Sequence, residues 1–580
     1  MPDYTAANLT FTNFTRFLPA ISRAQDVFVR QKIMERIWNR DYTVWSPEPD
    51  EISNRLGWLS SPQKMLPAIR EIDLIVAECQ RDGFTHGLLL GMGGSSLAPE
   101  LYSIAFPKND RFSLQVLDST HPAAVDACRR RLDVSKTLFI VSTKSGGTEE
   151  TLSFFKYFYN VVHTEVGPEL AGNQFVAVTD QGSALERISQ RYKFRKIFLN
   201  DPDIGGRFSA VTHFGLVPAA FCGIDLTEIL NRAAQMASLC SPKQPLIENP
   251  AAILGITLAE LAINGRDKLT FVIPPQLSRF GDWVEQLIAE STGKHGTGIL
   301  PVVNEEIDNV NLYGSDRVFI LLDQQRNHRA EDGFSEQYER LERTGQPLVR
   351  IPIEDVYDLA GQFFLWEMTT VIIGWRLKIN PFDQPNVESA KARTREIINK
   401  YRTSGKLPEL PVQTSDKQFT AYASYSGQDI NECINNWISE AHQGDYLAIQ
   451  AFLEPTPETD QSLARLRKSL TNITHLATTV GYGPRYLHST GQLHKGDRGN
   501  GLFLLLTDQI ALNIPIPDRA GEETSEITFD SLHRAQAMGD HQALREAGRR
   551  VLWLHIFRDA GKSIHQLSDL IAKLSWNHPW

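Results

Sequence analysis

Cysteine is scarce in this chain of 580 residues. The five cysteines are scattered, odd in number and form no CxxC pair, which argues against a disulfide framework and against a zinc site. They are typical of small buried side chains in a reducing compartment. We therefore expect a protein without a bound metal. The five are Cys79, Cys128, Cys222, Cys240 and Cys433.

Long apolar runs and an excess of positive charge are also missing. No apolar stretch approaches the ~20 residues that span a membrane. The first twenty residues lack a basic stretch followed by an apolar one, so we expect no signal peptide. The formal net charge of -10 makes the chain a poor candidate for nucleic-acid binding, although a locally positive phosphate site remains compatible with it. These absences predict a cytoplasmic protein with neither a membrane nor a nucleic-acid partner.

From Gly83 onward, short apolar segments alternate with Gly- or Ser-rich turns and helix-like segments. Strands that alternate with helices predict βαβ units and mostly parallel sheets, whose ligands lie beyond the carboxyl ends of the strands. The strand candidates before residue 403 are THGLLL, SLQVL, KTLFIVS, QFVAVTD, RKIFLN, KLTFVI, RVFILLD and PLVRIPI. Those after residue 417 are FTAYASY, YLAIQAFL, LATTVGYG and GLFLLLT.

The order of these segments predicts an α/β protein of several units. We expect a helical N-terminal segment (1–65), a first parallel-sheet domain (66–240), a second one (241–402) and an additional C-terminal α/β region (418–580). The polar, proline-containing segment 403–417 is typical of a linker between two such units.

Two turns combine glycine with hydroxyl groups just before predicted helices. GMGGSSLAP (91–99) offers three glycines and two serines, and STKSGGTEET (142–151) offers three hydroxyls, two glycines and a lysine. Exposed N–H and O–H donors at the positive end of a helix suit a phosphate. The alternative is a pair of plain strand-to-helix turns, since Glu149 and Glu150 could satisfy the helix dipole themselves.

Three later segments, taken with these turns, resemble the glucose-6-phosphate isomerase (phosphoglucose isomerase) family. They are DIGGRFSAVTHFG (203–215), WVEQLIAESTGK (283–294) and INPFDQPNVESAK (379–391). Five ordered matches over residues 84–391 are far more specific than any one of them. The segment GYGPRYLHSTGQLHKG resembles the isomerase half of transaldolase–isomerase fusions. The residues before the isomerase motifs are too few for a transaldolase barrel of ~250 residues.

The resemblance implies two sugar-isomerase-type, flavodoxin-like domains and reversible isomerisation of glucose 6-phosphate and fructose 6-phosphate. It implies no cofactor or metal, a hexose phosphate as the small-molecule partner, and a homodimer by analogy. Two alternatives stay open. A regulatory protein of the same fold would bind hexose phosphates without turning them over, but it has no need to keep Glu290, Arg207 and Lys391 together. A dual phosphoglucose/phosphomannose isomerase would share the chemistry.

Isomerisation through a cis-enediol needs a base, a cation near the developing oxyanion and a group that opens the sugar ring. The resemblance assigns the base to Glu290 and the cation to Arg207. The alternatives are a solvated helix-end glutamate for Glu290 and a structural ion pair for Arg207, to Asp203 or to a distant acid. The substrate-binding residues that it implies are Gly94, Ser95, Thr143, Lys144, Ser145, Thr148, Gln286 and Gln384.

Three residues, Lys391, His488 and His494, are candidates for ring opening. Lys391 follows Gln384 by seven residues in a predicted helix, with Pro385 in its first turn, so the two should share a face. The alternative for Lys391 is one of several basic residues on a solvated helix.

The family's histidine usually precedes the long apolar helix, but residues 295–360 hold only His295 and His328, in no matching context. His488, in LHSTGQLHKG, resembles that histidine in a displaced position, with His494 as a second choice. The C-terminal region must then fold back, within the chain or across a dimer.

Overall fold

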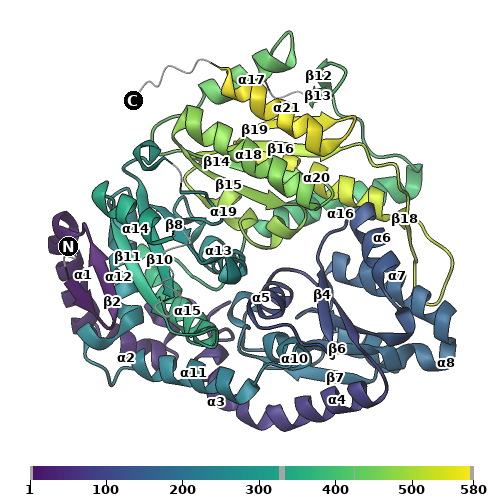
Figure 1. Cartoon of the computed structure of the whole chain (residues 1–580), viewed down its shortest axis with the longest axis horizontal. Coiled ribbons are helices and arrows are strands. Elements are labelled where there is room, and N and C mark those ends of the chain that lie inside the picture. Colours follow the sequence, from purple (N-terminus) through teal and green to yellow (C-terminus); the bar gives the residue numbers. More distant parts are fainter. Residues whose placement is uncertain (1–3, 308, 325–333, 423–424, 575–580) are drawn as a thin grey trace.

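The computed structural model describes residues 4–307, 309–324, 334–422 and 425–574. These residues form three large sheets and a small two-stranded one, β17 (Pro515–Ile516) with β18 (Ile527–Thr528), with helices packed around them, which confirms the expected α/β class (Figure 1). The domain boundaries given above remain predictions. No helix among the described residues is long and apolar enough to cross a membrane.

The first sheet is entirely parallel and has the strand order β4-β3-β5-β6-β7. Its central strands are continuous apolar runs that are buried along their whole length, as expected for a parallel sheet covered by helices on both faces. The strands are β3 (His86–Gly91), β4 (Ser113–Leu117), β5 (Thr137–Ser142), β6 (Phe175–Asp180) and β7 (Lys196–Asn200). Its helices include α5 (Leu97–Ala105), α6 (Pro122–Arg131), α7 (Glu149–Val166) and α10 (His213–Phe221).

The second sheet has the order β1-β2-β11-β10-β8-β9. Its last four strands are parallel, whereas β1 and β2 form a hairpin that adds antiparallel to β11. The N-terminal segment is therefore helical after residue 12, as expected, and in addition begins with a hairpin. The strands are β1 (Tyr4–Ala6), β2 (Leu9–Thr12), β8 (Lys268–Val272), β9 (Leu300–Val302), β10 (Arg317–Gln324) and β11 (Leu348–Ile353).

Buried helices join the first two sheets. α12 and α15 are apolar almost all round, and α13 lies beside α15 and α5 near the middle of the molecule (Figure 1). A helix that is apolar all round belongs in a core. These helices are α12 (Pro250–Ile263), α13 (Arg279–Thr292) and α15 (Asp358–Leu377); the N-terminal helices α1 (Leu18–Arg30) and α4 (Ile69–Arg81) lie outside them.

The C-terminal region forms the third sheet, with the order β12-β13-β19-β16-β14-β15. Sequence analysis missed two of its strands. One is β12, which lies within the expected linker 403–417 and pairs with β13. The other is β19, which pairs in parallel with β16 and antiparallel with β13. Residues 423–424 of the predicted strand FTAYASY lie outside the described residues. The strands are β12 (Val412–Ser415), β13 (Phe419–Tyr422), β14 (Tyr446–Phe452), β15 (Ala477–Tyr482), β16 (Gly501–Asp508) and β19 (Arg550–Ile556).

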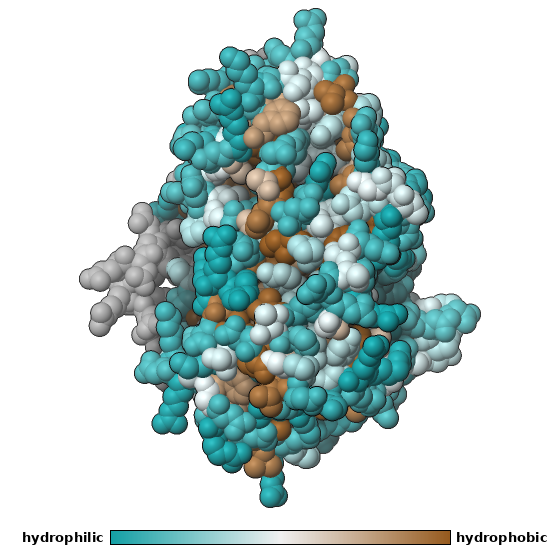
Figure 2. All heavy atoms as spheres, turned by 90° about the vertical axis from the view of Figure 1, so that its right-hand side faces the viewer, coloured by the Kyte–Doolittle hydropathy of each residue, from teal (hydrophilic) through white to brown (hydrophobic). Residues whose placement is uncertain are grey.

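Two antiparallel helices connect this third sheet to the rest of the chain. Helix α16 (Val387–Ser404) packs against α20 (Phe529–Glu546), and Figure 1 shows α20 and α16 between the third sheet and the first. The outer helices of the third sheet include α17 (Ile430–Ser439), α18 (Pro457–Thr474) and α21 (Ala560–Ala572). Figure 2 shows that the face on the right of Figure 1 is largely hydrophilic, with apolar side chains in a narrow, interrupted band.

Candidate active site

The two hydroxyl-bearing turns lie side by side because β3 and β5 are neighbours in the first sheet. Gly91 and Ser142 are paired in register, so residues 92–96 and 143–148 leave the sheet at the same edge. Thr143 and Thr148 share a hydrogen bond of 2.9 Å between their hydroxyl oxygens. The N–H of Gly147 donates to Oγ of Ser145 at 3.3 Å. The turn thus gathers hydroxyl groups at the N-terminus of α7, as the sequence predicts.

A third loop meets the first of these turns at very close range. A Cβ atom on Gly94 would lie 2.1 Å from the carbonyl oxygen of Gly206, which precedes Arg207. Only glycine permits this approach, because backbone atoms cannot move aside as a flexible side chain can. Ser95, the next residue, is buried. The loop that carries Arg207 is therefore locked against the turn of residues 93–95.

The guanidinium of Arg207 contacts residues from several segments of the chain. Its Nη1 atom lies 3.1 Å from Oε1 of Glu290 and donates to Oε1 of Gln384 at 2.8 Å. Its Nε atom donates to Oγ of Ser291 at 2.7 Å, and Nη2 donates to the carbonyl oxygen of Pro381 at 2.7 Å. Burial lowers the pKa of Arg207, although the charge of Glu290 opposes this shift. Arg207 thus contacts Glu290, from a different unit of the chain, rather than Asp203.

Glu290 and Gln286 lie one helical turn apart on α13, on the face turned toward Arg207. The Nε2 atom of Gln286 donates to Oε2 of Glu290 at 3.0 Å and to the carbonyl oxygen of His488 at 2.7 Å. The side chain of Glu290 keeps 13% of its surface exposed, against 4% for Arg207. The carboxylate is therefore oriented by two donors and still accessible.

His488 reaches this place from the C-terminal region of the same chain. It ends the short 3-10 helix η13 (Arg485–His488), and its Nε2 atom lies 3.1 Å from Oε1 of Glu150. Glu150 is buried in the first turn of α7. Burial would raise the pKa of Glu150, but the charge and hydrogen bond of His488 bring it below its ordinary value. His488 and Glu150 are thus in contact at the end of the turn of residues 143–148.

Sequence analysis did not select Glu150, although a signal was present. Glu150 continues the apolar face of α7 through Phe154 and Phe158, whereas Glu149 is exposed on the other face. A carboxylate on an apolar helix face beside a hydroxyl-rich turn indicates a buried, functional acid.

A second residue without a sequence signal holds Glu150. The Nε2 atom of Gln536, on α20, donates to Oε1 of Glu150 at 2.7 Å, and Oε1 of Gln536 accepts from the Thr120 hydroxyl at 2.7 Å. Thr120 in turn lies 2.9 Å from Nδ1 of His533. Because the Thr120 hydroxyl proton is used toward Gln536, His533 must donate to Thr120. The buried carboxylate therefore ends a hydrogen-bond chain of fixed direction.

The helix predicted around Pro385 begins later than expected. Helix α16 starts at Val387, so Gln384 lies outside it, and the prediction that Gln384 and Lys391 share a helix face is wrong. The physical reason is that a residue before proline is disfavoured in the helical conformation. Gln384 lies instead in an extended segment held by the buried Lys294, whose Nζ atom donates to the carbonyl oxygen of Asp383 at 2.6 Å.

The other predicted residues lie further from this cluster. Lys144 pairs with Asp180 and donates to the carbonyl oxygen of Pro202 at 3.0 Å. Lys391 is half-exposed and pairs with Glu388 at 2.9 Å, although its charge is felt by Glu150. His494 is buried against Tyr446 in the C-terminal core, and burial puts its pKa well below the ordinary value. His328 lies outside the described residues.

The comparisons with known proteins agree on one family. The family model described as phosphoglucose isomerase matches residues 79–311, which include both turns, Arg207, Gln286 and Glu290. The glucose-6-phosphate isomerase of Carboxydothermus hydrogenoformans is 28% identical over 410 residues, which cover 61% of this chain and 87% of that protein. The enzyme of the same name from Synechococcus elongatus is 29% identical over 437 residues, 69% of this chain and 81% of that one.

This chain is similar to phosphoglucose isomerases over residues 79–311 and to the two enzymes named above. Among solved structures, a hypothetical protein of Thermus thermophilus has a TM-score of 0.57 and 26% identity, and covers 67% of this chain and 99% of that one. A glucose-6-phosphate isomerase of Chlamydia trachomatis, 19% identical, shares the fold with the same TM-score of 0.57 over 70% of this chain and 90% of that one. His488 and Gln536 lie outside the matched segment 79–311.

Proposed function

We propose that this protein interconverts glucose 6-phosphate and fructose 6-phosphate with Glu290 as the base. The observation that carries the proposal is the contact between Glu290 and the buried Arg207, beside the hydroxyl-rich turn of residues 143–148. A carboxylate, a guanidinium and an anion-binding turn are the groups that an enediol mechanism on a phosphorylated sugar requires. The reaction belongs to glycolysis and gluconeogenesis.

The turn of residues 143–148 would hold the phosphate. Thr143, Ser145 and Thr148 supply hydroxyl donors, and the N-terminus of α7 supplies a positive dipole. Gly94 and Ser95 border the same edge. Lys144, which is paired with Asp180, contributes through its backbone position rather than as a free cation.

Glu290 would carry the proton between C1 and C2 of the open-chain sugar. It takes a proton from one carbon, which leaves a cis-enediol, and returns that proton to the other carbon. Negative charge develops on the neighbouring oxygen, where the Arg207 guanidinium stabilises it. Gln286 and Gln384, which contact Glu290 and Arg207 respectively, would orient the two groups and bind sugar hydroxyls.

His488 would open the ring, with Glu150 as its charged partner. The imidazole of His488 would deliver a proton to the ring oxygen, and the Glu150 carboxylate, whose pKa lies below its ordinary value, would orient the ring. Lys391, whose charge acts on Glu150, would assist from the outer side. A homodimer, which the resemblance implies, is not needed to bring this histidine to the site, since one chain supplies it. Five free cysteines agree with the predicted cytoplasmic location.

The deciding experiment measures conversion of fructose 6-phosphate in a coupled assay with wild type and Glu290→Gln. The amide keeps the size of the side chain but cannot accept the proton. We expect kcat to fall by roughly 10²- to 10⁴-fold, while calorimetry still detects substrate binding. Full turnover by the Glu290→Gln variant would reject the base assignment. Absence of turnover by the wild type, with hexose phosphate still bound, would favour the regulatory alternative.

A further inference from the structure

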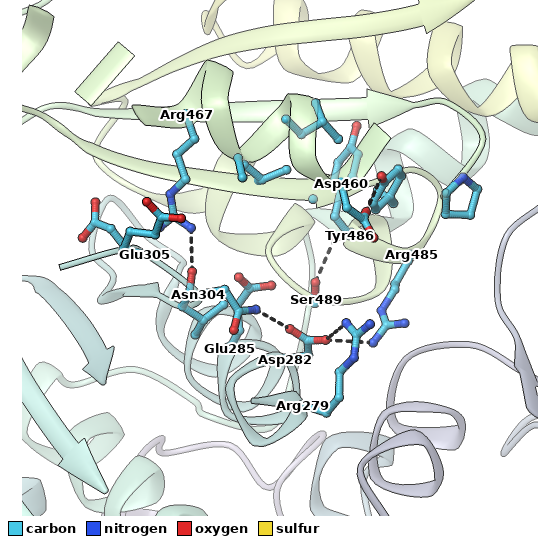
Figure 3. Close-up of a pocket in the computed structure, with 18 of the residues that line it drawn as sticks. Arg279, Asp282, Glu285, Asn304, Glu305, Asp460, Arg467, Arg485, Tyr486 and Ser489 are labelled. Atoms are coloured by element: carbon cyan, nitrogen blue, oxygen red, sulfur yellow. Dashed lines mark hydrogen bonds and ion pairs between the residues drawn. The ribbon is translucent and has the colours of Figure 1, made fainter. Parts of the chain in front are cut away.

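A cavity of about 490 Å³ lies on the side of α13 away from Glu290. Its walls are formed by α5, α13, α18 and the segment from β15 to η13 (Figure 3). It therefore lies between the part of the chain that carries the family motifs and the C-terminal region. Its volume is in the range of small-molecule sites. None of the predicted active-site residues lines it. It is therefore a separate candidate site.

Arg467, on α18, is the unusual side chain of this cavity. It is only 7% exposed, and Figure 3 shows it reaching from α18 toward Asn304 and Glu305. Its Nη1 atom donates to the carbonyl oxygen of Val303 at 2.8 Å. Its Nε and Nη2 atoms are buried and have no hydrogen-bond partner among the described residues. Buried donors without an acceptor are rare, because each costs free energy that folding must offset.

The two unpaired atoms lie on one edge of the guanidinium. Nε–H and Nη2–H point in parallel from that edge, at the spacing of two oxygens of a carboxylate or a phosphate. The edge used toward Val303 is the other one. The Nε–Nη2 edge of Arg467 can therefore donate two parallel hydrogen bonds to an oxyanion in the cavity.

Nearby cations engage most of the acidic residues of the cavity, although the charge of Glu305 also acts on Arg467. Arg485 pairs with Glu100, with Asp118 at 3.0 Å and with Asp282 at 3.2 Å. Arg279 pairs with Asp282 at 2.8 Å. These pairs fill the end of the cavity opposite Arg467 (Figure 3).

The acids that face Arg467 are also accounted for. Glu305, on the segment after β9, pairs with Arg317 at 2.9 Å, and Glu306 lies 3.7 Å from Lys468. On α13, burial raises the pKa of Glu285 to about 8, so this carboxyl is protonated at neutral pH and can donate a hydrogen bond. Asp460, near the N-terminus of α18, accepts a hydrogen bond from the Tyr482 hydroxyl at 2.6 Å.

We propose that this cavity is a second ligand site, which binds the carboxylate or phosphate group of a small molecule through the Nε–Nη2 edge of Arg467. The site is independent of the proposed isomerase reaction. Its wall includes Arg485, Tyr486 and Ser489, whereas His488, within the same short segment, faces Glu150. A ligand in this cavity therefore contacts the segment that carries His488, the proposed ring-opening residue, on the side away from Glu150.

The experiment is a calorimetric titration of the full chain with inorganic phosphate and, separately, with succinate. We expect the wild type to bind an oxyanion at a site that Arg467→Gln weakens by roughly 10- to 100-fold. Arg465→Gln is the matched control, since Arg465 lies two residues away on α18, pairs with Asp569 and does not line the cavity. This control variant should bind as the wild type does.

The two probes separate the possible sources of the oxyanion. Binding of phosphate alone assigns the site to phosphorylated ligands, and binding of succinate alone assigns it to carboxylic acids. Phosphate that the active site binds is displaced by fructose 6-phosphate and survives Arg467→Gln. Equal binding of both probes by wild type and Arg467→Gln, or no binding that depends on Arg467, overturns the proposal.

Arg467→Lys covers the case in which Arg467→Gln does not fold. Lysine keeps the charge but cannot donate two parallel hydrogen bonds, so it should also weaken binding. Unchanged binding by a folded Arg467→Lys variant would contradict the two-pronged contact. The result is distinct from the fate of the isomerase reaction, because Glu290→Gln removes turnover and leaves this cavity intact.

Discussion

The imidazole of His488 and the carboxylate of Glu150 meet at 3.1 Å, although 338 residues separate them in the sequence. Glu150 belongs to the first sheet unit, and His488 belongs to the C-terminal region. The folding of one chain thus completes a pair that neither unit contains alone. Since the charge of His488 lowers the pKa of Glu150, the pair contributes to stability as well as to the site.

Replacement of Glu150 by Gln should reveal both contributions. We expect kcat on cyclic fructose 6-phosphate to fall by about 10- to 100-fold, because the imidazole of His488 loses the carboxylate that orients it. The folded-state pKa of Glu150 lies below its ordinary value of 4.5, so its stabilising effect is present above that pH and is lost as the pH falls. Thermal unfolding of the variant and of wild type should therefore differ more at pH 7 than below about pH 4.

The control for this variant is Glu149→Gln. Glu149 precedes Glu150 but is exposed on the opposite face of α7. It should leave both the turnover and the pH profile of stability nearly unchanged. Equal losses in the two variants would mean that the effect comes from the helix dipole and not from His488.

Removal of the amide at Gln536 should act through Glu150. Gln536→Leu deletes a donor to a buried carboxylate, so the pKa of Glu150 rises and its ionised form becomes less favourable. We expect kcat to fall by about 10-fold with KM little changed, and the acid limb of the pH–rate profile to move to higher pH. Gln542→Leu, on the exposed side of the same helix, is the matched control.

A purely structural role for Gln536 would give a different result. The variant would then lose thermal stability with no movement of the acid limb, and the activity that remained would keep the wild-type pH dependence.

The sequence predicted the parts of the site that local patterns determine. The two turns follow buried strands directly, so the strand pattern predicts that they lie at one end of the sheet. Glu290 follows Gln286 by four residues, so helical spacing predicts that the two side chains share a face. The pairing of Arg207 with Glu290 joins two units through tertiary folding, and periodicity cannot report it. His488 was found through its resemblance to a family motif, whereas Gln536 carries no motif and reaches Glu150 only because α20 packs beside α16.

The errors have equally specific causes. The helix predicted with Pro385 in its first turn starts only at Val387, because Pro385 disfavours helical geometry at the residue before it. The strand β19 was overlooked although Gly548, with a φ of 71°, ends the long helix before it. The hairpin of β1 and β2 is short and takes its stability from β11, far along the chain.

The close approach of Gly94 to Gly206 predicts a sharp contrast between two alanine variants. Gly94→Ala places a methyl group 2.1 Å from a backbone carbonyl oxygen, so the turn or the Arg207 loop must move. We expect a loss of about 1–3 kcal/mol in stability and at least a tenfold loss in kcat/KM. A methyl group at Gly206 meets nothing within 4 Å, so Gly206→Ala should fold and bind nearly as wild type.

Steady-state kinetics and thermal unfolding of the two variants provide the check. Similar losses at both positions would indicate general sensitivity of the loops to alanine, and full activity of Gly94→Ala would show that the contact does not fix Arg207.

The raised pKa of Glu285 predicts an unusual dependence of stability on pH. The folded chain retains this proton up to about pH 8, whereas the unfolded chain releases it near the ordinary pKa of 4.5. Between these values the folded state binds more protons than the unfolded state, so the contribution of Glu285 to stability falls as the pH rises. Glu285→Gln stays neutral at every pH and removes this slope. Melting temperatures of the two proteins should therefore be similar near pH 5 and diverge by pH 8.5, with the variant the more stable; parallel curves across this range would contradict the burial of a protonated carboxyl.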